Sequence, residues 1–139
     1  MRLGFAAVRT EDLVTALDAL LDQADRVVGV RMAQWIEESG LNLHQTRLLL
    51  AIAGHDELTE ISAVAEEAGL SIDLAYPCVH ELDRRGLTRG EHRRHAITDA
   101  GREMVATFSA ARREATTSFI DALDDRQRRR LEVVVGSDD

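Results

Sequence analysis

The apolar positions from Leu13 to Ile36 follow the spacing of one long amphipathic helix, with steps of three and four residues. They are Leu13, Leu17, Leu20, Leu21, Ala24, Val27, Val28, Met32, Trp35 and Ile36. Thr10, followed by two acidic residues, is the expected N-cap, Gly40 is the expected end, and Gly29 in the interior indicates a bend or a close helix approach. A helix of roughly 30 residues is longer than a compact domain usually needs, so we expect it to cover a second surface, for which a partner chain is a candidate.

Capping residues and glycines predict three shorter helices after the long one. Asn42 is the expected cap of a helix that ends at Gly54, and Thr59 is that of a short helix that ends before Gly69. Ser71 is the expected cap of the third helix. Two short helices joined by a glycine-containing turn are typical of a helix-turn-helix unit.

The helix after Ser71 has two distinct faces. The residues expected in the core are Ala75, Cys78, Val79 and Leu82. The residues expected to point outward are Ile72, Asp73, Tyr76, Pro77 and His80. The surface of this helix is therefore predicted to be formed by polar, aromatic and proline side chains.

The rest of the chain indicates a small hairpin and two more helices. Residues 87–89 and 95–97 have the composition of short strands around a five-residue connection, and Gly86 precedes them. Thr98 and Asp99 predict the start of a long helix, and residues 124–127 have the spacing of a capping box for a last one. The predicted fold is mainly α with a small β wing, a winged helix-turn-helix between long N- and C-terminal helices.

Charge argues against strong nonspecific binding to nucleic acid. The 139 residues carry a formal net charge of −8, and all basic residues are arginine. Residues 41–101 hold six arginines and ten acidic residues, a net charge of −4, so the acidity is not confined to the flanks. Phosphate neutralisation supplies most nonspecific affinity, so a site on nucleic acid would depend on a local arrangement of arginines.

Composition also limits location and chemistry. No apolar run is long enough to span a bilayer, and the first nine residues lack the apolar region of a signal peptide, so we expect a cytoplasmic protein without membrane contact. No phosphate-binding loop, serine elbow or defined carboxylate pair is present, so we expect neither an enzyme nor a cofactor. A metal site at His92 and His95, or redox sensing by Cys78, is a minor alternative, because Cys78 falls on the predicted core face.

The order of these elements, together with four segments of the sequence, resembles the MarR family of bacterial transcription regulators. The similarity runs from about Leu41 to Leu131. The segments are LNLHQ at 41–45, VAEEAGLS at 64–71, VHELDRRGL at 79–87 and ITDAGR at 97–102. Each is weak alone, but four in order between long terminal helices are a specific match.

The resemblance implies a homodimer that reads double-stranded, pseudo-palindromic DNA and is often a repressor released by a small aromatic effector. The single domain, residues 1–139, would then comprise dimerisation helices at 10–40 and 99–136 and a winged helix-turn-helix at 41–98. The candidate base-reading residues are Ser71, Asp73, Tyr76 and His80, and those for backbone contact are Arg84, Arg89, Arg93 and Arg94. A possible effector pocket would be lined by Arg31, Trp35, His44 and Arg47, although core or dimer packing is the alternative for Trp35.

Two features depart from the family pattern. Residues 71–83 contain no arginine or lysine, and Pro77 lies in the helix interior, where proline costs roughly 3 kcal/mol and favours a kink or a displaced helix start. The wing is short, with seven residues between Arg89 and Ile97. These departures favour an alternative function, a MarR-fold protein with weakened or lost DNA binding that acts as a small-molecule or protein-binding module.

Overall fold

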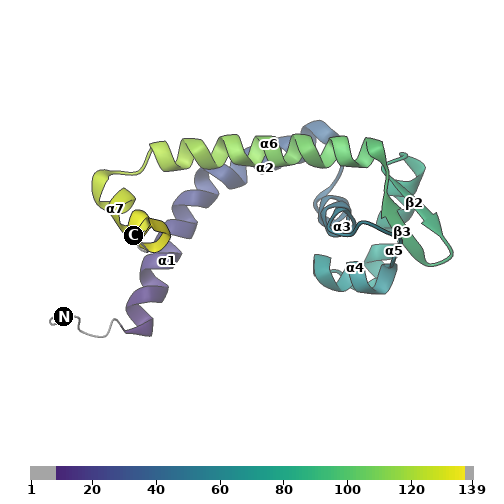
Figure 1. Ribbon diagram of the computed structural model, residues 1–139, viewed down its shortest axis with the longest axis horizontal. Coiled ribbons are helices and arrows are strands. Elements are labelled where there is room, and N and C mark those ends of the chain that lie inside the picture. Colours follow the sequence, from purple (N-terminus) through teal and green to yellow (C-terminus); the bar gives the residue numbers. More distant parts are fainter. Residues whose placement is uncertain (1–8, 137–139) are drawn as a thin grey trace. The chain divides into compact units, whose positions relative to one another are not determined.

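The computed structural model describes residues 9–136, in two compact units (Figure 1). One unit comprises residues 32–111, and the other combines the described residues up to 31 with those from 112 onward. The expectation about a signal peptide concerns residues that lie outside the described part, apart from Arg9. Within that part, no helix has the length and apolar character needed to span a membrane.

The core of the unit formed by residues 32–111 lies among three helices and a small sheet. The helices are α3 (Leu43–Ala53), α4 (Ile61–Ala68) and α5 (Ile72–Arg84). Its largest fully buried side chains are Leu48, Leu49, Ile52, Ile61, Val64, Val79 and Leu82. These are the apolar positions that recur at helical spacing in the sequence, so burial of one face of each helix explains why the three pack together.

The helix starts in this unit are capped largely as expected. The Asn42 side chain accepts a hydrogen bond from the Gln45 backbone N–H at 2.8 Å, and the Gln45 side chain accepts one from the Asn42 N–H at 3.0 Å. Ser71 accepts one from the Leu74 N–H at 3.3 Å. Thr98 caps α6 (Asp99–Asp121), whose Gly101 N–H donates to the Thr98 hydroxyl at 3.1 Å. Each contact satisfies a backbone donor that the helix leaves free.

The sheet has three antiparallel strands in the order β1-β3-β2. The hairpin strands β2 (Thr88–Glu91) and β3 (Arg94–Ile97) confirm the expected wing, with only two residues between them. Strand β1 (Thr59–Glu60) was not expected, and the prediction that Thr59 caps α4 is wrong, because the N-cap is Glu60 and Thr59 pairs with His95. The pairing anchors the base of the wing to the helix-turn-helix.

The long N-terminal helix is present but not uniform. It runs as α1 (Thr10–Ala24), a π-helical segment η1 (Asp25–Gly29) and α2 (Val30–Ser39), so Gly29 marks the end of a π-helical stretch. The predicted cap at Thr10 is wrong: Arg9 occupies the N-cap position without a side-chain cap. In the same unit as α1, Asp124 and Gln127 form the expected capping box at the start of α7 (Asp125–Gly136).

Candidate nucleic-acid interface

The turn between α4 and α5 sets the direction in which α5 leaves the core. Gly69 ends α4 with a φ of +72°, a left-handed conformation that glycine adopts without strain. The Ser71 cap then starts α5 at Ile72. The helix-turn-helix expected from the sequence is therefore formed, and its second helix spans 13 residues.

The two faces of α5 divide as predicted. Ala75, Val79 and Leu82 have no exposed surface, and Cys78 is buried at 8% exposure. The residues expected outward are all exposed. The helix continues through Pro77 without a displaced start, although proline cannot donate to the carbonyl of Asp73 one turn earlier. Pro77 is exposed and thus lies on the solvent-facing side of α5.

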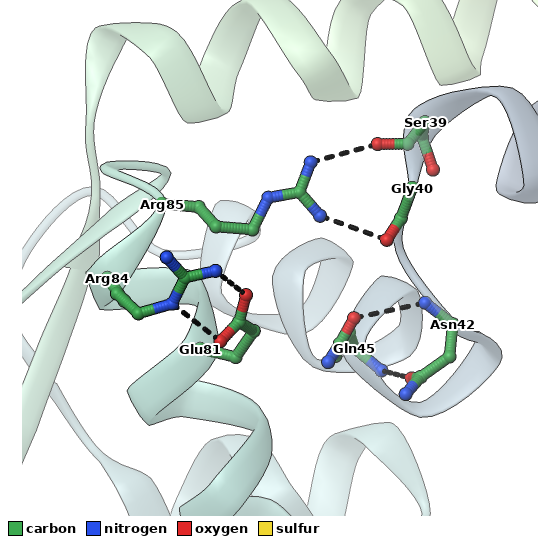
Figure 2. A network of polar contacts seen from close by, with 7 residues as sticks. All are labelled: Ser39, Gly40, Asn42, Gln45, Glu81, Arg84 and Arg85. Carbon is green, nitrogen blue, oxygen red and sulfur yellow. Dashed lines mark hydrogen bonds and ion pairs between the residues drawn. The ribbon is translucent and has the colours of Figure 1, made fainter.

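Near the C-terminal end of α5, the charges of Glu81 and Arg84 neutralise each other. The Arg84 Nε donates to Glu81 Oε1 at 2.8 Å, and this hydrogen bond lowers the pKa of Glu81 and raises that of Arg84 (Figure 2). Arg84 is exposed but already has a carboxylate partner. On α5 itself, Asp73 is an exposed acid in the first turn.

The wing presents its arginines to solvent. Arg89, Arg93 and Arg94 are all exposed, and Arg94 lies 3.4 Å from a Glu60 carboxylate oxygen. Within residues 9–136, Arg89 and Arg93 take part in no ion pair. His92, at the turn, has a φ of +60°, which lets the two-residue connection close. The wing therefore has two arginines available for a phosphate or a groove.

His95 is a structural residue of the wing. Its side chain is buried, and Nδ1 lies 3.3 Å from Asp83 Oδ2, while the Thr88 hydroxyl donates to Asp83 Oδ1 at 2.6 Å. Gly90 makes room for the ring, since a Cβ at that position would lie 2.6 Å from the ring carbon Cε1. His95 therefore packs inside the wing, whereas His92 is exposed at its turn. No group of three metal-ligating side chains occurs among the described residues.

Arg85 has a role that the sequence analysis missed. Its guanidinium donates to the backbone oxygens of Ser39 at 2.9 Å and Gly40 at 3.1 Å, at the end of α2 (Figure 2). An arginine at a helix C-terminus satisfies carbonyls that the helix leaves free. Arg85 thereby ties the end of α5 to the connection between α2 and α3. No local sequence signal could have identified this contact, because its partners are 45 and 46 residues away.

Cys78 lies on the buried face of α5, as predicted. Desolvation by burial raises the pKa of its thiol, which lowers the fraction of reactive thiolate. A redox sensor needs the opposite environment. The position of Cys78 therefore favours a packing role.

Three residues of the possible effector pocket, Trp35, His44 and Arg47, have different surroundings. Trp35 is 6% exposed, its indole N–H donates to the Thr107 hydroxyl at 3.0 Å, and its ring meets that of Phe108 edge-on at 5.0 Å. His44 and Arg47 are exposed on α3. Arg47 lines an open hollow of about 530 Å³, whose other lining residues are Leu50, Ala51, Gly54, His55, Glu67 and Ala68. The packing of Trp35 supports the core alternative, and the effector pocket stays a prediction.

Comparison with known proteins supports the fold through solved structures. No family model matches the sequence, and no curated protein matches it significantly. A MarR family protein of Mycobacterium tuberculosis, solved in complex with DNA, is similar with a TM-score of 0.67 at 17% identity, over 87% of this chain and 95% of that one. The multiple antibiotic-resistance repressor of Listeria monocytogenes is similar with a TM-score of 0.69 at 15% identity, over 90% and 91%.

A third structure extends the similarity to another bacterium. A MarR family transcriptional regulator of Silicibacter pomeroyi is similar with a TM-score of 0.61 at 23% identity, over 91% of this chain and 95% of that one. Likeness at these identities concerns the arrangement of helices and strands, which is the arrangement derived above from caps, apolar faces and strand pairing. The chain has the winged helix-turn-helix fold of the MarR family of transcription regulators.

Proposed function

We propose that the protein is a homodimeric DNA-binding transcriptional regulator, and specifically a ligand-responsive repressor. One observation carries the proposal: the eight residues expected at a DNA interface are all exposed, within the unit that holds α5 and the wing. In this function α5 enters the major groove and the wing lies along the backbone or the minor groove.

The wing supplies the cationic part of the interface. Arg89 and Arg93 are exposed and unpaired among the described residues, so binding a phosphate breaks no ion pair in the free protein. Arg84 and Arg94 must share their charge with Glu81 and Glu60. The proposed interface thus holds fewer available cations than its four arginines suggest, and we expect modest affinity with a shallow salt dependence.

Exposed apolar residues on α1 support the homodimer. Leu13, Val14, Leu17 and Leu21 each expose more than half of their surface, and no residue of α1 is buried. Burying such a stripe against a second copy would remove it from water, which is the usual reason for a long apolar helix surface.

The second candidate function is a MarR-fold module that has lost DNA binding and binds a small molecule or a protein. The acidic residues on and beside α5 favour it, because Asp73 and Glu81 would approach a negatively charged backbone. Asp83 weighs less in this comparison, since its carboxylate contacts Thr88 and His95.

A titration with DNA separates the two functions. Fluorescence anisotropy at low salt should give tighter binding to duplexes from beside the protein's own gene than to shuffled duplexes of the same composition. The variant carrying Arg89→Ala and Arg93→Ala is the control, and it should bind both kinds of duplex more weakly. Equal affinity for genomic and shuffled duplexes would rule out the regulator and leave the binding module.

A further inference from the structure

The outward side of α5 is apolar at its centre. At about 100° per residue, four residues line up opposite the buried face. They are Asp73, Pro77, His80 and Arg84. Tyr76 lies beside Pro77 and is 38% exposed, and its ring lies 6.4 Å from that of His80. We call Tyr76 and Pro77 the apolar ridge.

The same surface lacks the side chain that most often reads guanine. Arginine and lysine recognise guanine by donating to O6 and N7 in the major groove. Residues 71–83 contain neither, and the guanidinium of Arg84 already binds Glu81 through two hydrogen bonds. Histidine at position 80 can donate one hydrogen bond and cannot form the two-pronged contact.

The apolar ridge suits a different feature of the major groove, the 5-methyl group of thymine. Of the four bases, only thymine presents an apolar group in the major groove, its 5-methyl. A proline ring and an aromatic ring offer it carbon surface, and burying a methyl group against them removes apolar area from water. Asp73 accepts hydrogen bonds only, and so it suits the amino group of cytosine and disfavours a phosphate.

We propose that the apolar ridge, Tyr76 and Pro77, selects the DNA site through thymine 5-methyl groups and that α5 makes no two-pronged guanine contact. This inference rests on the proposed DNA-binding function and specifies the base that the site must contain. It also gives Pro77 a role. Its ring removes one hydrogen bond from the helix, but it supplies the apolar surface at the centre of the outward side of α5.

The first experiment starts from duplexes selected out of a random library with the full-length protein. In the best selected duplex, each thymine is replaced in turn by deoxyuridine, which removes only the methyl group. Each guanine is replaced by 7-deazaguanine, which removes the N7 acceptor. At one or two thymines per half-site we expect deoxyuridine to weaken binding about fourfold, the value for one buried methyl group. At positions facing α5, 7-deazaguanine should lower the affinity by no more than the roughly tenfold of one hydrogen bond.

A pair of variants assigns the effect to the ridge. Pro77→Ser removes the ring and keeps the helix, because serine is the better helix former. Its affinity for the thymine duplex should fall about fourfold to that for the deoxyuridine duplex, so the ratio between them becomes about one. Leu74→Ser is the control, because Leu74 is 48% exposed on the same helix but lies roughly 90° round from the outward line. Leu74→Ser should keep the ratio of the affinities for the thymine and deoxyuridine duplexes near four.

The outcomes separate the inference from the function. Selection that yields no duplex bound more tightly than random DNA overturns both. A selected duplex that is insensitive to deoxyuridine overturns the inference alone, and so does one whose affinity falls under α5 with 7-deazaguanine by more than the roughly tenfold of one hydrogen bond. A ratio near four that persists in Pro77→Ser and in Tyr76→Ser would also overturn it, because the methyl effect would then come from elsewhere.

Discussion

The two arginines at the end of α5 have different partners. Arg84 pairs with Glu81 on the surface of the same helix, whereas Arg85 donates to two backbone oxygens at the end of α2. A surface pair three residues apart contributes little to stability, because water screens the two charges. Hydrogen bonds from a charged group to carbonyls that lack helical donors contribute more.

Replacing Arg85 should therefore destabilise the protein more than replacing its neighbour. Arg85→Ala is expected to lower the free energy of unfolding by about 1–2 kcal/mol, because two carbonyls lose their donor. Arg84→Ala, the matched control, should change it far less, because the ion pair of Arg84 with Glu81 is exposed and screened by water. Urea unfolding followed by circular dichroism measures both, and equal midpoints for the two variants would contradict the role given to Arg85.

The thiol of Cys78 should react slowly in the native protein. Burial raises its pKa, so less thiolate is present than in the unfolded chain at the same pH. The folded thiol also holds its proton more tightly than the unfolded one, so the free energy of unfolding should fall as pH rises past the ordinary thiol pKa. Reaction with a chromogenic disulfide, in buffer and in urea, tests this. Equal rates in both would mean that Cys78 is accessible.

At this scale, sequence reasoning succeeded where the signal is local. Asn42, Ser71 and Thr98 cap helices because a short polar side chain reaches a backbone N–H two or three residues ahead. It did not identify the contact of His95 with Asp83 or those of Arg85 with Ser39 and Gly40, which are set by the tertiary structure. Thr10 fell inside the helix, because Arg9 precedes it with extended backbone.

Among the elements, the wing is the one whose electrostatics can be tested most directly. Arg93→Ala should lower the slope of log affinity against log salt concentration by about one unit, the value for one phosphate contact. Arg94→Ala should lower it by less, since Arg94 already faces Glu60. Anisotropy titrations at several salt concentrations give both slopes. An unchanged slope for Arg93→Ala would mean that this side chain does not contact the backbone of DNA.

The start of α6 packs so closely on Leu87, the residue before β2, that only glycine fits at position 101. A Cβ at position 101 would lie 2.0 Å from the carbonyl oxygen of Leu87, and a backbone atom cannot move aside as a side chain can. Gly101→Ala should therefore lower the free energy of unfolding by about 3 kcal/mol or more. Gly29→Ala is the control: its nearest neighbour would be Asp25 Cβ at 3.8 Å, and it should be neutral or stabilising by up to about 1 kcal/mol. Thermal unfolding of the two variants checks the contrast.

The helices were predictable from the sequence, and the smallest strand was not. The apolar face of α5 repeats at helical spacing, so Ala75, Cys78, Val79 and Leu82 could be assigned to the core. Strand β1 has two residues, too few for any alternation, and exists because β3 pairs with it. The π-helical turns of η1 likewise have no sequence signature beyond Gly29 at their end.

For the molecule as a whole, net charge and apolar surface point to assembly before binding. A monomer with a net charge of −8, in which only Arg89 and Arg93 lack an ion pair among the arginines of α5 and the wing, has little attraction for DNA. Two copies joined through α1 would present two wings and two copies of α5 to one duplex. The second contact is then intramolecular, which raises the overall affinity without new contacts.

The apolar stripe of α1 should decide the oligomeric state. Introducing charge with Leu13→Glu and Leu17→Glu is expected to give a monomer, because each side chain exposes 57% of its surface and would be buried in a dimer. Ala19→Glu, on the opposite side of the same helix, should leave a dimer. Sedimentation equilibrium distinguishes these states, and a dimer for the double variant would refute the assigned interface.

The contact of Arg85 with α2 has a consequence for local unfolding. The amide of Gly40 donates to Glu37 and that of Arg85 to Glu81, so each reports on the last turn of its own helix. The guanidinium of Arg85 connects the end of α5 to the end of α2. Unfolding of either last turn therefore breaks these hydrogen bonds and removes a stabilising contact from the other turn. The two amide hydrogens should therefore exchange with solvent at similar free energies in the native protein, as members of one cooperative unit. Helix ends 45 residues apart in the chain would then fray together.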